Sequence, residues 1–297
     1  MENTKKLLRF EKASKIRIET LADNALYFSS FSSFNDLFDV VVDSSSIEHQ
    51  LFDIERIKNA LMGLYGSLAS FEWPLNSQLV DTVNRWLNNP EEYDELDIGE
   101  GGYISIRKQS ALEGELRSRI SEVFDGAPIC CFFESDVSDP LMWAHYSDNH
   151  SGICVEYEFW VGIFNLYNVG KNYEVLPMTY ATSKAPLDPL KFLLNPYEEA
   201  IRSLSTKSVD WAHEKEVRII SKVGQVGRGK LPERMKVSKV YLGLRFMTER
   251  RELLDSVLDV VSQCQAELFV MVKNNTAMTL EPMPWTIYEE RMKLRKE

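Results

Sequence analysis

The sequence predicts an α+β protein built on a mixed or mainly antiparallel sheet. Strand-like runs and helical patterns are both abundant, but they do not alternate as regular β-α-β units. With 297 residues, 44% of them hydrophobic, the chain is also long and apolar enough to bury a full core. We expect a single domain over residues 1–297, with a helical insert at 44–124.

The first forty residues show the order strand, helix, strand, loop. Residues 7–10 are a short strand candidate, 16–22 a short helix, and 25–29 a second strand. The following segment, 30–39, is rich in Ser and Phe and ends the pattern. It predicts a loop that leads into the insert.

The insert is expected to be helical because apolar residues recur three or four positions apart. Three such stripes occur, and the second ends at Asn88-Asn89-Pro90. Acidic residues then dominate through Glu100, before Gly101-Gly102. The stripes consist of Leu51, Ile54, Leu61 and Leu64; Leu75, Leu79, Val83 and Leu87; and Leu112, Leu116, Ile120 and Val123.

From residue 128 onward the pattern is mostly that of strands. The nearly continuous apolar run 129–133 is typical of a strand buried on both faces. Further strands are expected at 152–159, 173–180, 217–220, 239–242 and 267–272. Pro196 introduces a helix at 197–204, and Thr248 is expected to cap a second helix through 261. The glycine-rich segment 224–229 is expected to be a turn.

The charge balance argues against generic binding to nucleic acid. Thirty-four basic and 45 acidic residues leave a net charge of -11, so a phosphate backbone would require a local basic patch. The N-terminus lacks the apolar core of a signal peptide, and no window has the roughly 18 apolar residues that span a bilayer. The four cysteines form no C-x-x-C, which is typical of reduced thiols. We expect a cytoplasmic protein without membrane contact.

The segment 141–150 lies between two predicted core strands, so its residues are expected at an end of the sheet, where ligand sites are common. Trp143 and Tyr146 would share a face of a helical turn. His145 and His150 are five residues apart, which is not the usual i, i+4 spacing of metal ligands. A metal site is not expected, and structural and catalytic roles for these histidines both remain open.

A second polar segment contains Glu214, Glu216 and Arg218. On a strand, alternation would place all three side chains on one face. Neighbouring carboxylates raise one another's pKa while an arginine lowers it, and such tuning is common where carboxylates perform chemistry. Spacing alone favours an ion-pair cluster over a site.

The turn-forming segment 34–39, which includes Asn35 and Asp36, is equally consistent with a structural turn and a ligand-facing loop.

Taken together, these segments resemble a mostly bacterial family known as domain of unknown function 2971. The departures are Leu37, where the family usually has proline, and Val217, where an aromatic residue is common. The matching pieces are Leu8-Arg9-Phe10, Leu26 to Ser29, Phe34-Asn35-Asp36, Phe38-Asp39, Met142 to Tyr146, His150, Gly152-Ile153, Trp211, Glu214 to Glu216, Arg218 and Tyr241 to Gly243. The family name implies no activity.

The chain also resembles ADP-ribosyltransferases, which present an Arg or His, a Ser/Thr or Tyr motif and a glutamate in that order. Here Arg9, Tyr27 with Ser30, and Glu216 follow this order. The resemblance implies that Glu216 is the catalytic carboxylate, that Glu214 positions the acceptor and that Arg9 binds the pyrophosphate of NAD. The residues expected to complete the site are His145 and Tyr146 for catalysis, and Tyr27, Ser30, Asn35, Asp36, Trp143 and Arg218 for binding NAD.

The resulting expectation is an effector that cleaves NAD and transfers ADP-ribose to a macromolecular acceptor. The resemblance further implies a role in toxin–antitoxin or antiphage defence, with an antitoxin or defence protein as partner. Two alternatives remain open. One is a nuclease or other hydrolase that uses His145, Asp36 and Glu216, and the other is a non-catalytic, nucleotide-binding sensor.

Overall fold

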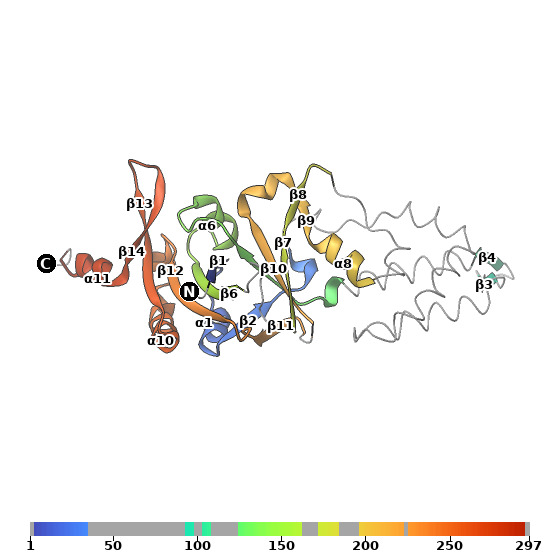
Figure 1. Ribbon diagram of the computed structural model, residues 1–297, viewed down its shortest axis with the longest axis horizontal. Coiled ribbons are helices and arrows are strands. Elements are labelled where there is room, and N and C mark those ends of the chain that lie inside the picture. Colours follow the sequence, from blue (N-terminus) through green and yellow to red (C-terminus); the bar gives the residue numbers. More distant parts are fainter. Residues whose placement is uncertain are drawn as a thin grey trace. The chain divides into compact units, whose positions relative to one another are not determined.

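The computed structural model describes residues 3–34, 93–97, 103–107, 124–161, 172–183, 196–222 and 225–294 (Figure 1). By its internal contacts the chain divides into two compact units. Unit 1 contains Met1–Ser29, Pro128–Tyr180 and Val209–Glu297, and unit 2 contains Ser30–Ala127 and Ala181–Ser208.

Within the described residues, unit 1 is organised around an eight-stranded sheet with the strand order β14-β13-β12-β6-β1-β5-β10-β7. All neighbouring strands are antiparallel except β12 and β13. The prediction of an α+β fold with a mainly antiparallel sheet is therefore confirmed. The strands are β1 (Asn3–Glu11), β5 (Ile129–Phe133), β6 (Ile153–Val161), β7 (Tyr173–Pro177), β10 (Glu216–Ser221), β12 (Met235–Leu242), β13 (Glu267–Asn274) and β14 (Thr279–Pro284).

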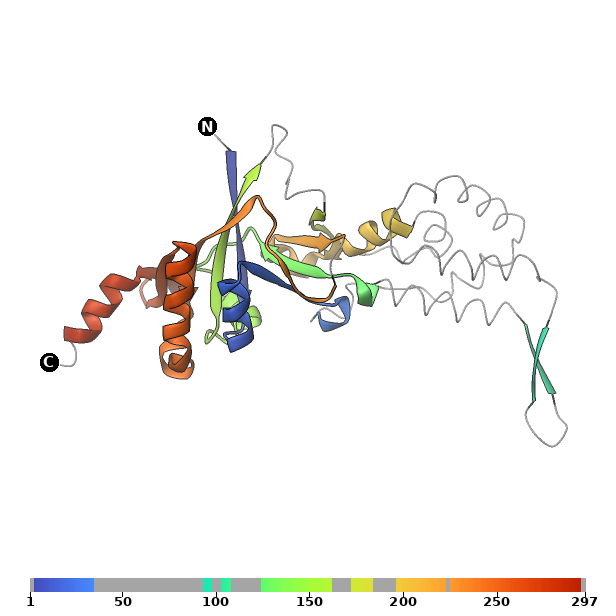
Figure 2. The same cartoon turned by 90° about the horizontal axis from the view of Figure 1, so that it is seen from below.

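Helices cover both faces of this sheet. On one face, α1 (Lys15–Ala22) and α10 (Leu254–Cys264) lie side by side (Figure 2). On the other face lies α6 (Pro140–Tyr146). The alternation along β1 fits this arrangement, because Leu7 packs with the α1 and α10 side chains while Leu8 packs with Met142 and Trp143 of α6. The central strands are therefore apolar toward both sides.

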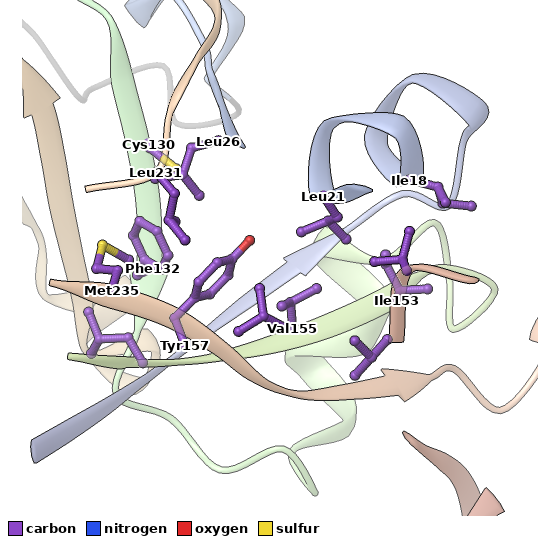
Figure 3. Packing of buried hydrophobic residues seen from close by; sticks show 14 of the residues in the cluster. Ile18, Leu21, Leu26, Cys130, Phe132, Ile153, Val155, Tyr157, Leu231 and Met235 are labelled. Carbon is purple, nitrogen blue, oxygen red and sulfur yellow. The ribbon is translucent and has the colours of Figure 1, made fainter. Parts of the chain in front are cut away.

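The larger core lies between the sheet and the α1–α10 layer. Side chains of α1, β5 and β6 meet there, with Tyr157 between Phe132 and Val155 (Figure 3). The Tyr157 and Phe132 rings meet edge to face, with centroids 5.3 Å apart. Burial of one such aromatic side chain stabilises the fold by about 1.5–3 kcal/mol.

The second half of the glycine-rich segment is a strand, so the prediction of a turn is wrong for residues 227–229, while Gly224 lies outside the described residues. β11 (Gly227–Lys230) pairs antiparallel with β2 (Ala25–Phe28). Gly229 permits this pairing, since a Cβ at that position would lie 2.8 Å from Cε2 of Phe28. The glycine provides room for a core aromatic ring, a requirement that local sequence does not reveal.

The predicted cap at Thr248 is also wrong. Thr248 lies inside the short helix α9 (Phe246–Glu249), where its hydroxyl donates to the Arg245 carbonyl oxygen at 2.8 Å. A 3-10 turn, η4 (Arg251–Leu253), follows before α10 begins. β14 and the C-terminal helix α11 (Trp285–Leu294) are further elements that the sequence pattern did not predict. No helix in the described part of the chain is long and apolar enough to cross a membrane.

Unit 2 contains the described part of the expected helical insert. Within it, β3 (Tyr93–Asp97) and β4 (Tyr103–Arg107) pair antiparallel, from Tyr93 with Arg107 to Asp97 with Tyr103. These two strands lie between the second and third apolar stripes and were not predicted, while the stripes themselves lie almost entirely outside the described residues. Unit 2 also contains the 3-10 turn η1 (Phe31–Ser33), α8 (Pro196–Leu204) and β9 (Thr206–Ser208), and β8 (Thr179–Ala181) ends at its boundary.

Candidate functional site

Four polar side chains of unit 1 form what we term the carboxylate cluster: Tyr146, Glu214, Glu216 and Arg218. They come from the last residue of α6, the last residue of the 3-10 helix η3 (Val209–Glu214) and the first half of β10. Glu214 was expected on the same strand as Glu216, and this is wrong. Lys215, between them, has a left-handed backbone (φ +48°) that turns the chain from η3 into the strand.

Glu216 and Arg218 form a bidentate pair along one face of β10. Nε of Arg218 donates to Oε1 of Glu216 at 2.7 Å, and Nη2 donates to Oε2 at 3.3 Å. The two residues are 3% and 0% exposed, respectively. Two charges removed from water in this way stabilise each other only because the geometry is close and additional hydrogen bonds are made. One of these joins the Cys131 thiol to the Glu216 side chain. Separately, the Glu216 backbone N–H donates to the Tyr180 hydroxyl at 2.7 Å, which holds the start of β10.

Glu214 is completely buried and receives a hydrogen bond from outside its own segment. The Tyr146 hydroxyl donates to its Oε1 at 2.5 Å. The Tyr146 ring lies 4.8 Å from the Phe133 ring, centroid to centroid, and Phe133 is the register partner of Glu216. The two glutamates are thus held beside the same pair of aromatic rings, with the Tyr146 hydroxyl bound to Glu214 and the Arg218 guanidinium bound to Glu216.

Cys131 is a further neighbour that sequence reasoning treated only as a buried thiol. It pairs with Arg218 in the β5–β10 register, and its thiol hydrogen-bonds to Glu216. Burial, followed by the charge of Glu216, raises the pKa of Cys131 well above its ordinary value. The thiol therefore stays neutral and acts as a donor. No local signal could have found it, because the contact depends on the register between two strands far apart in the sequence.

His145 and Trp211 lie next to the cluster. Their ring centroids are 6.1 Å apart, and the Trp211 ring stacks on His213 at 6.4 Å. The His145 centroid is 6.5 Å from that of Tyr146. His145 is exposed and Trp211 half-buried, so this aromatic group offers both a titratable ring and a stacking surface beside the buried carboxylates.

Arg9 lies on the opposite face of the sheet from the carboxylate cluster. It contacts the Cys130 thiol and donates to the Tyr27 carbonyl oxygen at 2.9 Å, on the side covered by α1. Cys131 and Phe133, which alternate with Cys130 along β5, face the cluster instead. The structure therefore does not bring Arg9 and Glu216 together on one face, and an NAD-binding role for Arg9 stays a prediction. Strand order and register place their side chains on different faces.

The structure assigns Arg9 a role in packing. It is 7% exposed, its Nε lies 3.2 Å from Oε2 of Glu11, and its guanidinium lies 5.7 Å from the centroid of the Phe132 ring. The Tyr27 ring is itself covered by the Arg17 guanidinium at 3.8 Å. Arg9 and Tyr27 therefore act together to join β1, β2 and α1.

The remaining predicted site residues have other locations. Trp143 is 0% exposed, its indole N–H donates to the Val137 carbonyl oxygen at 2.6 Å, and its ring meets Phe10 edge to face at 5.2 Å. This large residue fills the smaller core, and its expected contact with NAD stays a prediction. Ser30 belongs to unit 2, and Asn35 and Asp36 lie outside the described residues.

In the described ranges, no group of three or more His, Cys, Asp and Glu side chains is arranged to hold a metal ion.

The model of a family described as a protein of unknown function (DUF2971) matches residues 142–219, a segment that contains all four residues of the carboxylate cluster. No curated protein and no solved structure matches the chain.

Proposed function

We propose that the carboxylate cluster is the catalytic centre of an enzyme that cleaves the nicotinamide–ribose bond of NAD and transfers ADP-ribose to a macromolecular acceptor. The observation that carries the proposal is the pair of buried glutamates at the start of β10, with Glu214 bound to the Tyr146 hydroxyl and Glu216 to Arg218. A Glu-x-Glu pair at the entry to a buried strand is one of the features in which this chain resembles ADP-ribosyltransferases.

The chemistry requires a fixed negative charge near the ribose. When the bond between C1′ and the nicotinamide nitrogen breaks, nicotinamide leaves with the electron pair, and positive charge develops on the ribose as an oxocarbenium-like state. A preorganised carboxylate stabilises that charge without rearrangement during the reaction. Glu216 is suited to this role, because Arg218 and Cys131 hold it in one orientation.

Glu214 is suited to act on the acceptor. The acceptor nucleophile forms the new bond to C1′ and releases a proton, and Glu214 takes that proton as general base. The Tyr146 hydroxyl orients its carboxylate at 2.5 Å. Trp211, beside the exposed His145, supplies an aromatic surface for stacking on a planar ring such as nicotinamide. Arg9 has no part in this proposal, because it lies on the other face of the sheet.

The primary experiment is incubation of the full chain with NAD and measurement of released nicotinamide. Glu216→Asp retains the charge that compensates Arg218 but withdraws the carboxylate by about one methylene, so nicotinamide release should fall about 100-fold or more. Tyr146→Phe removes only a hydroxyl and should also slow release. Glu134→Gln, at an exposed residue paired with Lys5, is the matched control and should retain activity. If the folded wild type neither binds nor cleaves NAD, the proposal is wrong.

The burial of the cluster favours a second candidate, a non-catalytic, nucleotide-binding sensor. Glu214 and Arg218 are 0% exposed, as expected of polar groups that hold elements together. On this hypothesis, NAD or another nucleotide raises the melting temperature of the wild type while no nicotinamide is released. Nicotinamide release and the melting temperature, both measured with NAD, therefore distinguish the enzyme from the sensor.

A further inference from the structure

A separate cavity of about 360 Å³ lies in unit 1 at one end of the sheet. Its wall comes from four places: the start of α6, the loop that follows α6, the residues after β12, and the turn between β13 and β14. None of the described residues lining it belongs to the carboxylate cluster. Its volume is at the small end of the range for ligand pockets, enough for a compact metabolite.

The lining is basic in a chain that is strongly acidic. His150, Arg245 and Lys273 face the cavity, and among its described lining residues there is no Asp or Glu. The nearest acidic partner is Glu249, whose Oε1 lies 3.9 Å from Nη1 of Arg245 with both side chains about half exposed. An exposed ion pair of this kind contributes little stabilisation. In the described part of the chain, no carboxylate lies within ion-pair distance of Lys273. The positive charges of Arg245 and Lys273 therefore line the same cavity with little negative charge nearby.

The loop that presents His150 has an uncommon backbone. Asp148, Asn149 and His150 have φ values of +50°, +54° and +69°, three left-handed residues in succession. Such conformations cost free energy, persist only when the surroundings enforce them and cluster at functional sites. Here the His150 N–H donates to the Trp143 carbonyl oxygen at 3.1 Å, and the Arg245 N–H donates to the His150 carbonyl oxygen at 2.9 Å. The second bond connects the loop directly to a cationic residue of the cavity.

His150 is also incompletely satisfied. Its Nδ1 is buried and has no hydrogen-bond partner among the described residues. Burial, followed by the charges of Arg245 and Lys273, lowers the pKa of His150. The one nearby carboxylate on this loop, Asp148, is engaged by Arg250 at 2.8 Å and by Lys12 at 3.5 Å. An anion in the cavity would supply the negative charge that the lining, with His150, Arg245 and Lys273 and no carboxylate, does not contain.

We infer that this cavity binds the phosphate group of a small phosphomonoester through His150, Arg245 and Lys273. Arginine presents a fork of donors that matches phosphate oxygens, lysine adds a point charge, and the imidazole donates a third hydrogen bond. Leu244 and Leu280 form an apolar wall for the organic part of the ligand. The inference does not depend on NAD cleavage.

The test uses ribose 5-phosphate as probe, titrated calorimetrically into the full chain in a phosphate-free buffer near pH 7. Inorganic phosphate and ribose are the comparison ligands. Ribose 5-phosphate should bind, ribose should not, and binding of inorganic phosphate would show that the phosphate group alone is sufficient. The Arg245→Gln/Lys273→Gln variant should lose at least tenfold in affinity. Both side chains are exposed, so this variant should fold, and Lys273→Gln alone is the milder alternative.

The control removes two equivalent charges elsewhere. Arg291→Gln/Lys293→Gln alters the last turn of α11 and should leave binding unchanged. A second readout needs no variant: the imidazole resonances of His150 should shift on titration with ribose 5-phosphate, and the pKa of His150 should rise because an anion offsets the two cations. Absence of binding by both phosphate ligands would overturn the inference, as would equal affinity in the Arg245→Gln/Lys273→Gln variant.

Discussion

At the scale of single residues, the energetics of the carboxylate cluster depend on pairing. Arg218 is among the largest fully buried side chains of the described structure, and its charge is tolerable because Glu216 binds it with two hydrogen bonds. Removing one partner of a buried ion pair leaves an uncompensated charge in a poorly solvating environment. The same logic applies to Arg9 and Glu11 on the other face of the sheet.

We predict that Arg218→Met lowers the free energy of unfolding by about 3–5 kcal/mol, because Glu216 is left buried without its cation. The double variant Glu216→Gln/Arg218→Met should be more stable than the sum of the two single changes implies. Urea unfolding of the wild type, both single variants and the double variant measures this coupling. Additivity within about 0.5 kcal/mol would contradict the assigned pair.

For Arg9 we predict a loss of stability without a specific loss of chemistry. Arg9→Met should lower the free energy of unfolding by about 3 kcal/mol, because Glu11 keeps only the longer contact to Arg17, at 3.7 Å. Nicotinamide release per folded molecule should stay within about twofold of wild type. A release rate reduced as strongly as in Glu216→Asp would show that Arg9 contributes to the reaction after all.

At the scale of elements, the loop between α6 and β6 is held by two glycines that allow backbone segments to approach closely. A Cβ on Gly243 would lie 2.3 Å from the His150 carbonyl oxygen, and a Cβ on Gly152 would lie 2.3 Å from that of Glu11. The Gly243 N–H also donates to the Gly152 carbonyl oxygen at 2.9 Å. These contacts join the loop to the ends of β1 and β12, and they keep His150 at the cavity.

We predict that Gly243→Ala lowers the free energy of unfolding by about 1–3 kcal/mol or more, since the neighbouring atoms belong to backbone and cannot rotate away. Gly126→Ala is the matched control, because nothing lies within 4 Å of a Cβ built there. Thermal and urea unfolding of both variants make the comparison. Equal stability of the two variants would show that the loop adapts freely.

At the scale of the whole molecule, titration of His150 links stability to pH. Burial and the charges of Arg245 and Lys273 lower its pKa in the folded protein below the ordinary value of 6.5. The unfolded chain therefore takes up a proton first as the pH falls, and stability rises with pH across this window. The contribution of neutral His150 to the free energy of unfolding is complete above about pH 6.5, and it is lost as the pH falls toward the pKa of His150 in the folded state. The lowered pKa of Asp148, caused first by Arg250, acts in a separate window below its ordinary 3.8.

We predict that the wild type loses stability between pH 7.5 and pH 5.5, and that His150→Gln reduces this loss. Urea unfolding at several pH values measures both slopes. His213→Gln, which removes an exposed imidazole in η3, controls for the loss of a histidine as such. Parallel slopes for the wild type and His150→Gln would contradict the assigned environment of this ring.

The elements that sequence reasoning located correctly are those whose signals are local. The strands predicted at 129–133 and 152–159 are β5 and β6, and the helix predicted at 16–22 is α1. Errors arose where a distant partner, or a single left-handed residue, decides the conformation. Gly227–Lys230 is a strand because β2 lies beside it, and Glu214 leaves the strand because Lys215 turns the backbone.

By itself, the sequence determined the α+β class, most strands of unit 1, and the presence of Glu214, Glu216 and Arg218 beside a buried strand, because periodicity and turn residues act over a few positions. Only the tertiary structure decided which of the candidate residues share a site. It brings Tyr146 to Glu214 across 68 positions of sequence and places Arg9 on the other face. The physical reason is that side chains alternate along every strand, so strand order and register, which depend on packing between distant segments, determine which side chains meet.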